Sequence, residues 1–218
     1  MQSYPRILDM LEGEERARLL SIATEKHVGK GQLLYQQGDS SDTLFIILEG
    51  AVKVHYVLDA GDALTTLHYR AGMVVGAHGC TSWSGRHSWT AQALVDCRLL
   101  RIRRADFLAF VRNSPQALFC VLAITEFKGE QLKRLIRVLA QPTLERKILL
   151  AVRHFASLYG LVRGTEIEID GHITHQEIAD MVGASRQSVT MLLIALEKSG
   201  AIRRQGRRLF VPTATLDS

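Results

Sequence analysis

Short polar side chains and an arginine gather in residues 174–190 at spacings that suit hydrogen bonding to DNA. Thr174 can cap a first helix, with Glu177 completing a capping box, and Gly183 is placed to end that helix. Ser185 can cap a second helix, whose first turns then present Arg186, Gln187, Ser188 and Thr190. A guanidinium can donate two hydrogen bonds to a guanine edge in the major groove. The pattern therefore predicts a helix-turn-helix DNA reader.

A basic hairpin follows the second predicted helix. Ile202 and residues 209–211 have the character of two short strands joined at Gln205-Gly206. Four arginines flank this turn: Arg203, Arg204, Arg207 and Arg208. Guanidiniums make a poor core and a good phosphate clamp, so the hairpin is expected to be a wing that grips the DNA backbone. The alternative, a helical hairpin with a solvated turn inside a larger domain, does not explain why caps, glycine and basic wing occur in this order.

The distribution of charge supports a nucleic-acid partner. Residues 128–218 hold 14 Lys and Arg against 9 Asp and Glu, a net charge of +5, whereas residues 1–127 hold 13 of each. The whole positive excess of the chain thus coincides with the helix-turn-helix signal, as expected for a DNA-binding domain.

Composition excludes several other classes. No run of 18 uncharged apolar residues occurs and residues 1–13 are polar and acidic, so we expect a cytoplasmic protein without a transmembrane helix, a signal peptide or a membrane partner. The cysteines, Cys80, Cys97 and Cys120, are odd in number and widely spaced, which argues against both a zinc site and a disulfide framework.

Periodicity divides the chain into an α+β protein with three parts. Residues 5–25 have helical spacing, and residues 27–107 contain short alternating runs with turn residues between them, typical of a small β-barrel or jelly roll. Residues 114–140 predict a long apolar helix suited to pairing with its twin, followed by a hinge at Gln141-Pro142. The expected domains are a sensing barrel at 1–113, a dimerisation helix at 114–140 and a winged helix-turn-helix at 141–218.

The order of these parts resembles the Crp–Fnr superfamily of bacterial transcription regulators. In the barrel the resemblance rests on residues 31–39 and 44–54, which look like signature segments of the cyclic-nucleotide-binding fold, and later on residues 173–183 and 185–190. It implies a homodimer that binds two half-sites of double-stranded DNA, controlled by a small effector. RNA polymerase is a further expected partner if the protein is an activator.

The resemblance also assigns roles to the reader's side chains. Arg186 stands where the family reads a guanine, while Gln187 and Met191 replace the Glu and second Arg of the cyclic-AMP receptor. The half-site is therefore expected to differ from that receptor's. Phosphate contacts are expected from His175, Gln176, Ser185 and Ser188, and Thr174 and Thr190 are further candidate DNA-binding residues.

The effector segment departs from the cyclic-AMP pattern. Members that bind cyclic AMP have a Glu for the ribose and an Arg for the cyclic phosphate, whereas this chain has Ala77 and His87 there. Arg86, one residue early, still leaves a phosphate contact open. We expect an uncharged, aromatic or haem-like effector held by Val74, Val75, Gly76, Ala77, His78, Arg86, His87, Ser88, Trp89, Ile124, Phe127 and Lys128.

Two cofactor branches of the family can be compared with this chain. The segment ending at His78 resembles the haem-ligand segment of the carbon-monoxide-sensing branch, so His78 is the candidate iron ligand if haem is bound. The N-terminal proline ligand of that branch is absent, because residue 2 is Gln. An iron–sulfur cluster is not expected, since no cysteine precedes Cys80.

Two other functions compete with effector-controlled regulation. One is a DNA binder without effector, in which the barrel only dimerises the protein. The other is a cupin-like enzyme, which would need clustered histidines and glutamates on the barrel strands; the histidines here are scattered. We therefore expect a regulator and not an enzyme.

Overall fold

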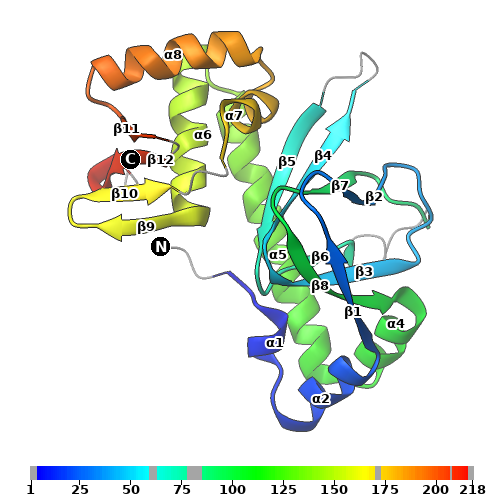
Figure 1. Cartoon of the computed structure of the whole chain (residues 1–218). Coiled ribbons are helices and arrows are strands. Elements are labelled where there is room, and N and C mark those ends of the chain that lie inside the picture. The colour runs from blue at the N-terminus through cyan, green and yellow to red at the C-terminus, as the bar shows by residue number, and fades with distance from the viewer. Residues whose placement is uncertain (1–3, 59–62, 78–84, 170–172, 207, 216–218) are drawn as a thin grey trace. The chain divides into compact units, whose positions relative to one another are not determined.

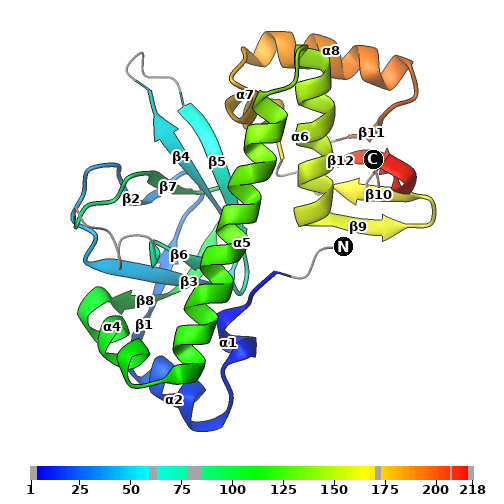
Figure 2. The same cartoon turned by 180° about the vertical axis from the view of Figure 1, so that it is seen from behind.

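The computed structural model describes residues 4–58, 63–77, 85–169, 173–206 and 208–215. The chain forms two compact units, one built mainly from residues 4–131 and the other mainly from residues 132–218 (Figures 1 and 2). Within the described residues no single helix is both long and apolar enough to cross a membrane, and α4 with α5 passes that test only as a sharply bent pair.

The N-terminal unit is built on two four-stranded sheets, in the strand orders β1-β8-β3-β6 and β2-β7-β4-β5. The strands are β1 Ala23–Val28, β2 Leu33–Tyr35, β3 Thr43–Glu49, β4 Ala51–Val57, β5 Ala63–Arg70, β6 Val74–Val75, β7 Thr90–Ala93 and β8 Cys97–Arg103. The alternating residues of β3 explain why a sheet forms there, because Leu44 and Ile46 pack into the core beneath the helices. The predicted jelly-roll class is confirmed.

Helices close one end of this unit (Figure 1). They are α1 Ile7–Met10, α2 Gly13–Ser21, α4 Arg104–Arg112 and the first part of α5 Pro115–Leu139. Phe107, Phe110 and Ile124 join the same core as Leu44 and Ile46. This helical layer forms one wall of an apolar cavity.

Two details of the predicted element order are wrong. Residues 5–25 are not one helical stretch, because Leu11 and Glu12 adopt extended backbone angles between α1 and α2, and β1 begins at Ala23. The strand region ends before residue 107, because α4 begins at Arg104.

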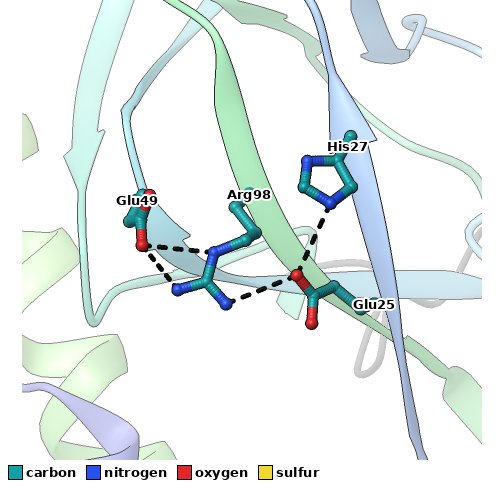
Figure 3. Close-up of polar contacts among 4 residues, drawn as sticks. All are labelled: Glu25, His27, Glu49 and Arg98. Atoms are coloured by element: carbon teal, nitrogen blue, oxygen red, sulfur yellow. Dashed lines mark hydrogen bonds and ion pairs between the residues drawn. The ribbon is translucent and has the colours of Figure 1, made fainter.

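Ion pairs on the surface hold three segments of the first sheet in register (Figure 3). Arg98 of β8 donates to Glu49 at the end of β3 at 3.2 Å and to Glu25 of β1 at 3.3 Å, and His27 lies 3.5 Å from Glu25. The hydrogen bond from Arg98 lowers the pKa of Glu49.

Gly50, directly after Glu49, turns the chain from β3 into β4. It has φ of 99°, and a Cβ there would stand 2.6 Å from the Cys97 sulfur, so the turn requires glycine.

The C-terminal unit packs three helices beside a small antiparallel sheet. The helices are α6 Leu144–Tyr159, α7 His175–Val182 and α8 Arg186–Lys198. The strands are β9 Gly160–Arg163, β10 Glu166–Ile169, β11 Arg203–Gln205 and β12 Arg208–Pro212, and their order in the sheet is β11-β12-β10-β9. The short 3₁₀ helix η1 Thr213–Thr215 follows β12. The buried side chains include Leu135 and Val138 from the end of α5. This is the predicted winged helix-turn-helix, with β9 as an additional strand.

Candidate functional site

The turn between α7 and α8 has the capping geometry that the sequence predicts. The Thr174 hydroxyl accepts from the Glu177 backbone N–H at 3.2 Å, and Ser185 accepts from the Ser188 N–H at 3.1 Å. Gly183 takes the left-handed conformation at φ 66°, ψ 46°. These caps fix where α8 begins and so which of its side chains occupy the exposed first turn.

Arg186 and Gln187 are the two predicted base readers, and both are exposed. Among the described residues, neither side chain has a hydrogen-bond partner. Met191, one turn further on, is 64% exposed. The structure thus leaves a guanidinium, an amide and a thioether exposed on the first two turns of α8.

Other predicted DNA contacts already have partners inside the protein. Ser185 and Ser188 share a hydrogen bond between their hydroxyls at 2.8 Å. Gln176 donates to Asp180 at 2.6 Å, and the Thr190 hydroxyl donates to the Arg186 carbonyl at 2.8 Å. These bonds orient the helix ends, and several would have to rearrange before the same groups could bind phosphate.

The arginines of the wing are also engaged. Arg203 donates two hydrogen bonds to the carboxylate of Glu166 in β10, from Nε at 3.1 Å and from Nη2 at 2.6 Å. Its guanidinium carbon lies 3.9 Å from the centre of the Phe210 ring. Arg208 lies 2.8 Å from Glu168. The Arg203 hydrogen bond lowers the pKa of Glu166. Sequence spacing gave no sign of these carboxylate partners, because they come from a strand almost forty residues earlier.

Arg204 has a different kind of partner from Arg203 and Arg208. Its Nη1 is 3.3 Å from Nε2 of His175, whose Nδ1 lies 2.8 Å from the Thr190 hydroxyl. Burial and the charges of Arg204 and Arg186 lower the pKa of His175. The structure therefore brings together His175, Thr190 and Arg204 of the predicted set; Arg207 lies outside the described residues.

An apolar cavity of about 150 Å³ lies in the N-terminal unit, between the end of β6, α4 and α5. Its lining comprises Val74, Ala77, Phe107, Leu108, Val111, Leu118, Val121, Ile124, Thr125 and Lys128. Four of the predicted effector residues are in this lining: Val74, Ala77, Ile124 and Lys128. The wall from α4 was missed by sequence reasoning, although apolar residues 107, 108 and 111 have helical spacing.

The remaining predicted effector residues lie elsewhere. Val75 and Gly76 are buried next to the cavity without lining it, and Phe127 faces Tyr4 at a ring distance of 6.4 Å. Trp89 meets the edge of Tyr56, and Ser88 is exposed. His78 lies outside the described residues.

The residues at the expected phosphate position are poorly placed for an anion. His87 is buried and stacked on Tyr35, with ring centres 3.6 Å apart. Burial lowers the pKa of His87, so its imidazole is neutral at pH 7. Arg86 is exposed and donates to the Gly38 carbonyl at 2.7 Å.

Comparison with known proteins agrees with both halves of this description. Residues 25–114 match the cyclic nucleotide-binding domain, and residues 133–214 match the Crp-like helix-turn-helix domain. Electron transport regulator A of Shewanella oneidensis is 24% identical over 192 residues, which cover 87% of this chain and 75% of that protein.

Solved structures show the same fold. A mutant of CooA from Carboxydothermus hydrogenoformans superposes with a TM-score of 0.79 at 21% identity, covering 97% of this chain and 92% of that one. CLP, described as a c-di-GMP responsive global regulator of Xanthomonas campestris, has a TM-score of 0.77 at 18% identity, with coverages of 91% and 98%.

A cyclic-nucleotide-type sensing domain joined to a winged helix-turn-helix defines a DNA-binding transcription regulator and not an enzyme. The chain belongs to the Crp–Fnr superfamily. The cupin-like alternative is thereby excluded.

Proposed function

We propose that the protein is an effector-controlled homodimer that binds a two-fold symmetric DNA site. The observation that carries this is the outer face of α8, where Arg186 and Gln187 are exposed and have no partner among the described residues. A recognition helix offers such groups to base edges in the major groove, and one helix serves each half-site.

Selection from a random duplex library tests the proposal directly. The enriched sequences are expected to be palindromic, with a guanine in each half-site for Arg186 and an adenine for Gln187. Enrichment without symmetry would contradict a dimeric reader, and no enrichment would contradict sequence-specific binding.

A small apolar molecule is the effector that the cavity supports best. In other proteins an apolar cavity of about 150 Å³ holds a benzene-sized ring. Among the described lining residues, Thr125 and Lys128 supply the polar side chains. Because the neutral His87 and the exposed Arg86 replace the phosphate ligand of the cyclic-AMP receptor, we infer that cyclic AMP is not the effector.

Ligand-induced change in DNA affinity tests this assignment. Single-ring probes such as toluene or phenol should raise the melting temperature and alter the affinity for the selected duplex, and Val121→Phe, which fills the cavity, should abolish both effects. Saturable binding of cyclic AMP that raised DNA affinity would overturn the assignment. If no molecule among the probes or cell metabolites changed DNA affinity, the effector-free alternative would stand.

Haem is a second candidate ligand, but the described lining of the cavity does not fit it. A porphyrin is far larger than the cavity, and no His, Cys or Met is part of the described lining. The haem proposal therefore depends on His78 alone. The absorption spectrum of protein expressed with haem available decides it, since bound haem gives a strong Soret band.

A further inference from the structure

His175 lies where three elements of the DNA reader meet. It is the first residue of α7, its Nδ1 is 2.8 Å from Thr190 Oγ1 of α8, and its Nε2 is 3.3 Å from Arg204 Nη1 of β11. The side chain is half-buried. A single imidazole thus connects the helix-turn-helix to the wing.

The hydrogen-bond partners define the protonation state of this imidazole. The one hydroxyl hydrogen of Thr190 is donated to the Arg186 carbonyl at 2.8 Å, so Oγ1 can only accept from His175. Guanidinium groups only donate, so the Arg204 contact requires a bare Nε2. Both conditions are met by one species, the neutral imidazole with its hydrogen on Nδ1.

The surrounding charges favour the same species. Burial and the two arginines, Arg204 on β11 and Arg186 on α8, lower the pKa of His175. Among the described residues, the acidic groups nearest in sequence are Glu177 and Asp180 of α7 itself; Glu177 is buried, and Asp180 accepts from Gln176. The charges that shift the pKa of His175 are those of the two arginines and not those of these carboxylates.

We propose that His175 is a positioning residue that holds Arg204 against the recognition helix, and that protonation of His175 releases the wing and weakens sequence discrimination. The proposal rests on the DNA-binding function proposed above. Protonation places a hydrogen on Nε2 opposite the guanidinium, which removes the hydrogen bond and sets two positive charges side by side. Arg204 is then no longer fixed relative to Arg186 and Gln187.

The positioning role predicts the opposite pH dependence of DNA binding from the phosphate contact that the sequence suggests for His175. A phosphate contact through Nε2 needs the protonated or Nε2–H imidazole, so acid would strengthen binding to every duplex alike. Under the positioning role, protonation in acid adds a positive charge to His175 but leaves Arg204 no longer fixed relative to the recognition helix. Specific binding should therefore lose its advantage over non-specific binding as the pH falls.

The test measures the ratio of the affinities for the selected duplex and a scrambled duplex between pH 7.5 and 5.5, at constant ionic strength. For the native protein the ratio should fall roughly three- to tenfold, the effect of one hydrogen bond. His175→Gln can donate to Thr190 and accept from Arg204 without titrating, so it should keep the neutral-pH ratio throughout. Arg204→Ala should show the reduced ratio already at pH 7.5.

Nitrogen NMR of the imidazole provides a readout that does not depend on DNA. It should report the Nδ1–H tautomer at neutral pH, and Arg204→Ala should raise the pKa of His175. A specificity ratio that rose or stayed constant in acid, or an Nε2–H tautomer, would overturn the proposal. Failure to prefer any duplex at any pH would instead contradict the DNA-binding function, while NMR would still decide the role of His175.

Discussion

Arg186 is the side chain of α8 most directly available to a guanine. It is exposed, it stands in the first turn, and no hydrogen bond among the described residues occupies its guanidinium. We expect Arg186→Ala to cost about 1–3 kcal/mol of specific binding and to relax preference at one half-site position. Affinities for a panel of single-base variants measure this. A uniform loss over the whole panel would show that Arg186 touches only phosphate.

Met191 gives the recognition helix an apolar contact next to its polar ones. Its side chain is 64% exposed and that of Ile194 is 42% exposed, so the second turn presents little that can hydrogen-bond a base. Apolar side chains in the major groove contact the thymine methyl group. Replacing each thymine of the half-site by deoxyuridine, which lacks only that methyl, should weaken binding at one position. In Met191→Ala the same replacement should have no effect; an equal loss in both proteins would contradict the contact.

At the scale of a single element, the exposed apolar side chains of α5 point to a dimer. Leu118, Phe119, Leu122 and Ile136 are 50%, 69%, 59% and 64% exposed. Phe119 and Leu122 have the three-residue spacing of a two-helix seam, and Ile136 follows Leu122 by two heptads. Burying one leucine contributes about 1.5–3 kcal/mol, and a symmetric interface buries it twice. Leu122→Glu should therefore weaken dimerisation roughly a hundredfold or more, as measured by sedimentation equilibrium.

Gln116→Glu is the matched control for that experiment. It introduces the same charge on the same helix, at an exposed polar position one turn before Phe119, so it adds charge without removing an apolar side chain and should leave the dimer intact. Equal loss of dimer in both variants, or none in Leu122→Glu, would show that the exposed apolar side chains of α5 are not the interface.

The wing divides its arginines between internal pairing and DNA. Glu166 holds Arg203 with two contacts, so neutralising Glu166 should free a guanidinium for the backbone. We expect Glu166→Gln to raise affinity for any duplex and to steepen the salt dependence by about one unit, while Arg204→Gln and Arg207→Gln should each lower that slope by about one unit. Glu12→Gln, in the N-terminal unit, supplies the charge-matched control. Unchanged slopes in the arginine variants would mean that the wing does not touch DNA.

At the scale of the whole molecule, two histidines whose pKa values are lowered in the folded chain make stability depend on pH. The pKa values of His87 and His175 are lowered in the folded chain, chiefly by burial. The unfolded chain therefore binds protons near pH 6.5 while the folded one does not, so the free energy of unfolding falls as the pH is lowered from about 7.5 to 5.5. Calorimetry across this range should show a falling melting temperature. His87→Gln and His175→Gln should each flatten this dependence, and an unchanged pH profile in both variants would contradict the assignment.

The DNA-reading half could be predicted from sequence because its signals are local. The Thr174 and Ser185 caps, the Gly183 turn and the buried stripe of α8 act over three to four residues, and each is confirmed. The long helix was predicted at 114–140 and is observed at Pro115–Leu139 for the same reason. The strands β3, β4, β5 and β8 lie within residues 27–107, where short runs between turn residues predicted strands.

Only the tertiary structure decided which side chains meet across the fold. Arg203 faces Glu166 and Arg204 faces His175 because antiparallel pairing and helix packing bring distant segments together, and neither contact leaves a periodic trace in the sequence. The cavity beside Ala77 needed α4 as its wall, which sequence reasoning had merged with the strand region. Residue types and local spacing determined the class of protein; long-range packing decided which polar groups remain available for DNA and which are already bound within the protein.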